Sequence, residues 1–109
     1  MRVLLLGGTK FLLSLLENLL SKEYVESISV ITSPRHATEK LDGVTFLDKV
    51  NNAAKNSILK DSFQIHNFES IENNKFIEIC NQHDIRISIS AAWIYKKKYI
   101  DQVGPILQM

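Results

Sequence analysis

The sequence predicts a doubly wound α/β domain with a parallel sheet in the strand order 3-2-1-4, incomplete at its C-terminal end. Two observations predict it. Short apolar runs alternate along the chain with stretches in which apolar residues recur at helical spacing. The first run, Arg2 to Leu6, is almost entirely apolar, as in strands buried on both faces. With 109 residues, 45% of them hydrophobic, the chain has room for one core.

The first half of the chain contains two strand–helix units. After the strand at 2–6, apolar residues from Phe11 to Leu20 fall on two adjacent helical rows, which predicts an amphipathic helix with a wide buried face that includes Phe11. A second strand is expected at 27–32, ended by Ser33-Pro34 because proline cannot donate to a sheet ladder. We expect residues 33–43 to form a polar loop and a second helix to begin near Thr45.

The second half repeats the alternation. Residues 62–66 predict a third strand, weaker in pattern than the others. Phe76, Ile77 and Cys80 then mark the apolar face of a third helix, with Asn73 as its N-cap. A fourth strand is predicted at Ile85–Ala91 and a short helix at 97–103.

Composition narrows the class of protein. The formal net charge is +1, which predicts no broad attraction for DNA and no DNA partner. No apolar stretch approaches the roughly 20 residues of a membrane span, and Lys10 interrupts the apolar N-terminus that would otherwise resemble a signal peptide. A single cysteine, Cys80, suits a reducing compartment. We therefore expect a cytoplasmic protein without a membrane partner.

The turn after the first strand is the first candidate site. In such sheets ligands bind beyond the carboxyl ends of the strands. A dinucleotide fingerprint needs further glycines after Gly7-Gly8, and the sequence has Lys10 and Leu13 there. No acidic residue closes the second strand, and the spacing of a P-loop is absent. The turn is therefore either a plain strand-to-helix connection or a site of another kind.

Three segments in order resemble one family. Gly8-Thr9-Lys10-Phe11 resembles the opening motif of methionyl-tRNA formyltransferases, SVITSPR at 29–35 resembles their second strand and turn, and ISISAAWIYKKKYID at 87–101 resembles a later strand, turn and helix. The chain is thus similar to the N-terminal part of a folate-dependent formyltransferase domain over residues 1–109. The resemblance implies a Rossmann-like sheet and a cytoplasmic enzyme of one-carbon metabolism.

The resemblance also implies a co-substrate and site residues. These enzymes transfer a formyl group from 10-formyltetrahydrofolate to an amine acceptor, here methionyl-tRNA or an amino sugar, without a metal. The turn Ala92-Trp93-Ile94-Tyr95 corresponds to the loop that receives the pterin ring. Gly8, Thr9 and Lys10 are expected on the substrate side. Gln108 falls on the family's catalytic asparagine position.

The family's catalytic histidine and aspartate have no counterpart in residues 1–109, which implies an inactive fragment. A general base is needed because the attacking amine must lose a proton. The alternative interpretation is a non-catalytic α/β binding or interaction module derived from the same fold. An unfinished sheet edge beside Ile85–Ala91 would also invite self-association.

Several residues keep two interpretations. Trp93 either stacks on a ligand or packs under the following helix. Lys96, Lys97 and Lys98 form either a solvated helix start or a contact for phosphate or a tRNA backbone in a longer chain. Cys80 and His83 have metal-ligand spacing, but without a second pair they predict core residues. His36 and His66 are expected near the ligand edge, without a nucleophile partner.

Overall fold

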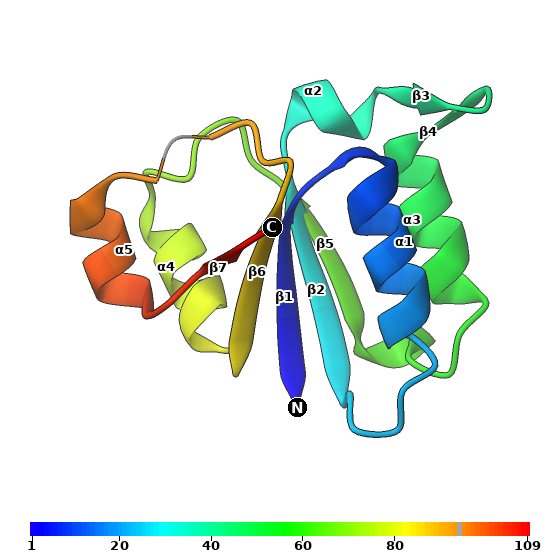
Figure 1. The fold of residues 1–109 in the computed structure, drawn as a ribbon, viewed down its shortest axis with the longest axis horizontal. Coiled ribbons are helices and arrows are strands. Elements are labelled where there is room, and N and C mark those ends of the chain that lie inside the picture. Colours follow the sequence, from blue (N-terminus) through cyan, green and yellow to red (C-terminus); the bar gives the residue numbers. More distant parts are fainter. Residues whose placement is uncertain (94) are drawn as a thin grey trace.

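Five parallel strands form the central sheet of the computed structural model, which describes residues 1–93 and 95–109 (Figure 1). The first strand, β1 (Arg2–Gly7), lies in the middle. It pairs on one side with β2 (Ser27–Thr32) and on the other with β6 (Ile85–Ile89). The short outer strands are β5 (Phe63–Asn67), beside β2, and β7 (Leu107–Gln108), beside β6.

The sheet order is β5-β2-β1-β6-β7. It differs from the predicted order 3-2-1-4 because β7 adds a fifth strand next to β6. The predicted fourth strand, Ile85–Ala91, therefore lies next to an edge strand, and it ends at Ile89 because Ser90 has a φ of 51°. All four ladders of this sheet are parallel, as expected when helices connect successive strands.

Helices cover both faces of the sheet. The helices α1 (Thr9–Leu19) and α3 (Phe46–Lys55) lie on one face, and α4 (Asn74–Asn81) and α5 (Lys97–Val103) lie on the other (Figure 1). The Thr45 hydroxyl caps α3 by accepting from the Asp48 N–H. The Asn73 side chain caps α4, as predicted, by accepting from the Phe76 N–H at 2.7 Å.

The region predicted as a polar loop, residues 33–43, is more ordered than expected. It contains the short helix α2 (Pro34–Ala37) and the first strand of a hairpin, β3 (Lys40–Leu41) with β4 (Val44–Thr45). Asp42 and Gly43 at the hairpin tip have φ angles of 54° and 83°. Two successive positive φ angles match the twist of a hairpin, and Asp-Gly is one of the dipeptides that adopt them readily. A 3₁₀ turn, η1 (Lys60–Ser62), precedes β5.

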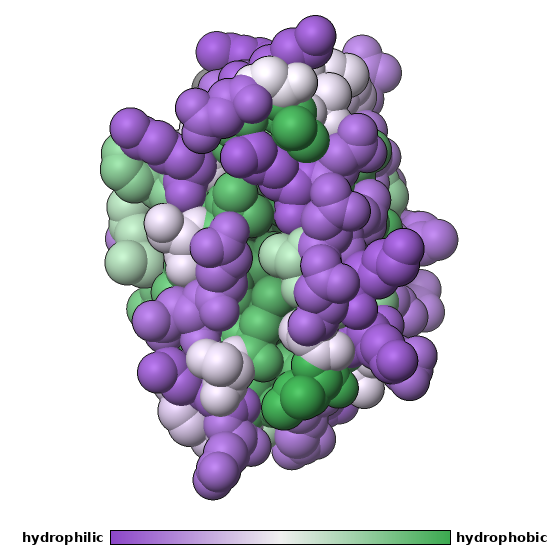
Figure 2. All heavy atoms as spheres, turned by 90° about the vertical axis from the view of Figure 1, so that its right-hand side faces the viewer, coloured by the Kyte–Doolittle hydropathy of each residue, from purple (hydrophilic) through white to green (hydrophobic). Residues whose placement is uncertain are grey.

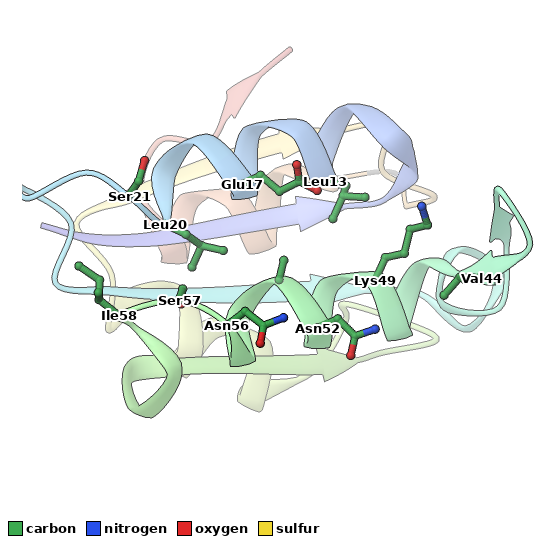
Figure 3. A pocket seen from close by; sticks show the side chains of 11 residues that line it. Leu13, Glu17, Leu20, Ser21, Val44, Lys49, Asn52, Asn56, Ser57 and Ile58 are labelled. Carbon is green, nitrogen blue, oxygen red and sulfur yellow. The ribbon is translucent and has the colours of Figure 1, made fainter.

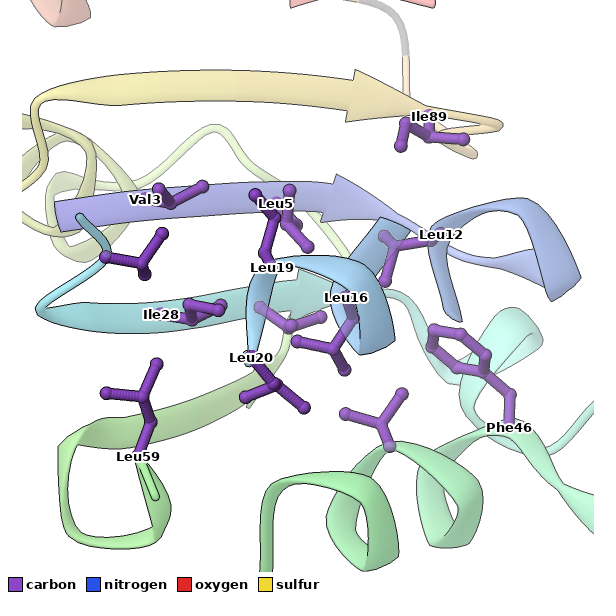
Figure 4. Close-up of a cluster of buried hydrophobic side chains, with 13 residues drawn as sticks. Val3, Leu5, Leu12, Leu16, Leu19, Leu20, Ile28, Phe46, Leu59 and Ile89 are labelled. Carbon is purple, nitrogen blue, oxygen red and sulfur yellow. The ribbon is translucent and has the colours of Figure 1, made fainter. Parts of the chain in front are cut away.

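The core consists of two clusters, one on each face of the sheet. Successive residues of β1 alternate between them, with Val3 and Leu5 on the α1/α3 side and Leu4 and Leu6 on the α4/α5 side. Figure 4 shows the first cluster, which includes Phe46 and leucines of α1. Since both faces are covered, β1 is buried from Val3 onward, which explains its continuous apolar run.

Phe11 does not belong to the buried face of α1. Its side chain is 62% exposed, whereas Leu12, Leu16 and Leu19 are buried as the helical pattern predicts. Phe11 lies in the first turn of α1, where the Lys10 ammonium sits 5.4 Å from the centre of its ring. The apolar row therefore begins one turn later than its sequence pattern suggests. Among the described residues, no helix is both long and apolar enough to cross a bilayer.

Candidate functional site

The turn between β1 and α1 is tightly constrained at the carboxyl edge of the sheet. Gly7 has a φ of 128°, and a Cβ there would lie 1.9 Å from the Ile89 carbonyl oxygen. The Gly8 N–H donates to that same oxygen at 3.1 Å. Thr9 has a φ of 71°, an uncommon angle for a β-branched residue. Gly7 is thus needed for the close approach of the turn to β6.

Gly8 also makes room for a buried histidine from the next strand–helix unit. A Cβ on Gly8 would lie 2.5 Å from Cγ of His36, whose side chain is only 8% exposed. His36 belongs to α2, which begins where β2 ends, and its Nδ1 lies 3.4 Å from a carboxylate oxygen of Glu39. The imidazole predicted near the ligand edge therefore packs against the β1–α1 turn.

The predicted folate turn follows β6. Ala92 is exposed, Trp93 and Tyr95 are partly buried, and Ile94 lies outside the described residues. The Tyr95 hydroxyl is 2.7 Å from the Ser88 hydroxyl. Burial raises the pKa of Tyr95, although the Ser88 hydrogen bond opposes this shift. The phenol is therefore a neutral group held on the end of β6.

The structure brings three of the predicted site segments together on two residues of β6. The Gly8 turn hydrogen bonds to Ile89. Tyr95 of the turn after β6 hydrogen bonds to Ser88, and Gln108 of β7 is the ladder partner of Ser88. Gln108 is exposed. Thr9 is partly buried and Lys10 is exposed.

Among the described residues, three buried polar atoms without a partner lie at or beyond the carboxyl ends of strands, and a fourth, Arg86 Nε, lies near the start of β6. Within residues 1–93 and 95–109, Trp93 Nε1, His66 Nε2 and Thr32 Oγ1 are buried and make no hydrogen bond. Thr32 ends β2, and His66 is the next-to-last residue of β5. Burial lowers the pKa of His66, and the nearby Lys75 lowers it further. Such unsatisfied groups cost free energy unless a ligand or water pairs with them.

Trp93 is partly a core residue. It packs with Phe68 and Tyr95 against the cluster between the sheet and the helices α4 and α5. Its ring is not fully buried, and its indole N–H is free of partners among the described atoms. The core interpretation of Trp93 is therefore met in part, and its contact with a ligand stays a prediction.

The lysine run is partly neutralised. The Lys96 ammonium lies 2.7 Å from the Glu72 carboxylate, which raises the pKa of Lys96 and lowers that of Glu72. Both side chains are exposed, so this ion pair adds little stability. The pair links the residue that follows the predicted turn 92–95 to the loop before α4. Lys97 and Lys98 are exposed, and the Lys98 ammonium lies 5.0 Å from the Tyr99 ring.

A second concave region lies away from the strand ends. A groove of about 820 Å³ runs between α1 and α3. Figure 2 shows an apolar band between two hydrophilic columns on this face. Figure 3 shows Leu13 of α1, and Leu20 just after α1, facing residues of α3. Its polar lining includes Glu17, Lys49 and Asn52. No residue predicted from the sequence as a site residue lines this groove.

Cys80 and His83 are not grouped with a third ligand-type side chain within the described residues. In the described part of the chain, no group of three or more His, Cys, Asp or Glu side chains is arranged to hold a metal ion. Burial raises the pKa of the Cys80 thiol to about 12, so it is protonated and inert near neutral pH. His83 instead hydrogen bonds to the Ile79 carbonyl and to Ser29.

Sequence reasoning missed two serines, Ser29 and Ser88. Each is buried in an apolar strand, and each hydrogen bonds to a side chain outside that strand. Ser29 bonds to His83, 54 positions away, and Ser88 bonds to Tyr95, seven positions away. The available signal was a polar residue at an inward position of a buried strand, because buried hydroxyls need partners. Comparison of the chain with protein-family models, with curated proteins and with solved structures finds no match.

Proposed function

We propose that residues 1–109 form the folate-binding part of a formyltransferase domain, which presents 10-formyltetrahydrofolate to an amine acceptor at the carboxyl edge of the sheet. One observation carries the proposal. The three segments that resemble the family's site, around Gly8, Tyr95 and Gln108, converge on Ser88 and Ile89. The position agrees with the general rule for ligands of doubly wound sheets.

The residues at this edge suit a flat heterocycle. A pterin needs an aromatic surface and polar groups for its edge, and the Trp93 indole supplies a ring and an unpartnered N–H. His66 adds a second unpartnered nitrogen, and its lowered pKa favours the neutral imidazole. Folate binding would relieve the cost of leaving such groups unpaired.

We assign these residues to folate binding only. The proton transfer from the attacking amine requires groups outside this set of residues. When bound, the folate supplies the formyl group that the amine attacks. Gln108 occupies the family's asparagine position by resemblance and would orient the formyl oxygen by donating a hydrogen bond. Since a missing general base costs about 10²- to 10⁴-fold in rate, we expect residues 1–109 alone to give only background formyl transfer.

The test is a titration with a reduced-folate analogue. Trp93 is the only tryptophan, so its fluorescence reports on the site directly. We expect a saturable change, with the dissociation constant confirmed by calorimetry. Trp93→Ala should weaken binding by about 1–3 kcal/mol, the range for aromatic stacking on bases.

Tyr24→Ala is the matched control. Tyr24 is an aromatic side chain that is 58% exposed and lies before β2, at the opposite edge of the sheet. The Tyr24→Ala substitution should leave the affinity for the folate analogue unchanged. A folded Trp93→Ala variant with unchanged affinity would remove Trp93 from the site, and absence of any saturable binding would remove the folate proposal.

The second candidate function is a non-catalytic binding module. The groove between α1 and α3 favours it, because this groove is independent of every residue that resembles the formyltransferases. A protein that fails to bind reduced folates, while remaining folded, would support this alternative.

A further inference from the structure

The Ser29 hydroxyl, the His83 imidazole and the Ile79 carbonyl form a hydrogen-bonded chain remote from the carboxyl edge. His83 Nδ1 is 2.6 Å from the Ile79 carbonyl oxygen, and His83 Nε2 is 2.9 Å from Ser29 Oγ. A carbonyl only accepts, so Nδ1 carries the proton of the neutral ring. Nε2 must then accept the hydrogen bond from the Ser29 hydroxyl. The imidazole is thereby held in the tautomer that a general base for Ser29 requires.

The pair opens into a cavity. A pocket of about 290 Å³ is lined by both residues and by the side chains of Gln64 and Gln82. Gln64 is the ladder partner of Ser29, so both side chains point to the same face of the sheet. Gln82 immediately precedes His83. Two carboxamide donors therefore share a cavity with a hydroxyl nucleophile and its base.

We propose that Ser29 and His83 form a second site, in which Ser29 accepts the acyl group of a small, uncharged carboxylic ester and His83 acts as general base. The volume limits the acyl group to a short chain. Asp61 also lines the pocket, which disfavours an anionic ester. The carboxamides of Gln64 and Gln82 are the donors available for the oxyanion.

The reaction balances without a cofactor. Ser29 Oγ forms a bond to the ester carbonyl carbon while its proton passes to His83 Nε2. The bond from that carbon to the alkoxy oxygen then breaks, and the departing alcohol takes the proton from His83. Water next attacks the acyl-serine, gives its proton to His83, and the carboxylic acid leaves as Ser29 recovers its proton.

The experiment is covalent labelling of the full chain with an uncharged alkyl fluorophosphonate, read by mass spectrometry, together with turnover of p-nitrophenyl acetate. We expect one adduct, on Ser29. His83→Ala should slow labelling by about 10²- to 10⁴-fold, the usual contribution of a general base. Ser27→Ala is the matched control, since Ser27 lies on the same strand and lines the same pocket without an imidazole partner within the described residues.

A second variant keeps the test independent of folding. Ser29→Cys retains a nucleophile at the same position and should react with iodoacetamide faster than the buried Cys80, and His83→Ala in that background should remove the advantage. Wild-type protein without an adduct on Ser29, or labelling at an unchanged rate in a folded His83→Ala variant, would overturn the proposal and leave the pair as a structural hydrogen bond.

Discussion

The close approach of the β1–α1 turn to β6 makes Gly7→Ala the most informative single substitution. Gly7 has a φ of 128°, which L-residues rarely adopt, and this strain alone costs about 1–3 kcal/mol. The added Cβ would lie 1.9 Å from the Ile89 carbonyl oxygen and 2.9 Å from its carbon, both backbone atoms. Relief requires β1 and β6 to separate at their carboxyl ends, where the Gly8 N–H bonds to Ile89.

We therefore expect Gly7→Ala to lower the free energy of unfolding by about 4 kcal/mol or more, which is exceptional for one methyl group. Gly43→Ala is the matched control, because Gly43 also has a positive φ, 83°, but nothing lies within 4 Å of its Cβ position. It should cost only about 1–2 kcal/mol, the strain of the left-handed conformation. Urea denaturation of the three proteins measures both values. If Gly7→Ala costs no more than Gly43→Ala, the turn does not approach Ile89 as described.

Three further outcomes follow from burial and capping. Burial lowers the pKa of His66 and of His83, so the folded chain binds fewer protons than the unfolded chain as the pH falls below about 6.5. The urea midpoint should therefore be constant above that pH and fall below it, and a flat profile down to about pH 5 would contradict this. Cys80, with its pKa raised to about 12, should resist iodoacetamide at pH 8 in native protein and react after unfolding; rapid native alkylation would show that it is accessible. Asn73→Ala should cost about 1 kcal/mol through loss of the α4 cap, whereas Asn74→Ala, one position later, should cost less; equal losses would exclude a capping role.

The parts of the fold that sequence could predict are those set by local chemistry. Helix α3 begins directly after its cap, Thr45, and α5 spans the predicted residues 97–103. The hairpin at 40–45 was not predicted, although Asp42-Gly43 is a strong local signal for such a turn. Phe11 was placed wrongly because helical periodicity does not reveal where along a helix the partner surface begins.

The site depends on contacts that no local pattern encodes. Thr9 and Ser90 adopt positive φ angles, against the preference of their residue types, and only the surrounding packing can hold them there. The His83–Ser29 hydrogen bond joins residues 54 positions apart. Ser88, on which Tyr95 and Gln108 meet, lies within a stretch that resembles the family, but the resemblance assigned no role to it.

The central place of β1 has a kinetic consequence. The strand that is synthesised first has its two neighbours far apart in the chain, for Val3 pairs with both Ile28 and Ile85. At the amino end of the second ladder, the Arg2 N–H donates to the Asp84 carboxylate across 82 positions of sequence. During synthesis, β1 can therefore pair with β2 early, but its other edge stays unpaired until β6 has been synthesised. Such long-range parallel pairing is slow, and the exposed edge invites pairing with another nascent chain until residue 89 has been made.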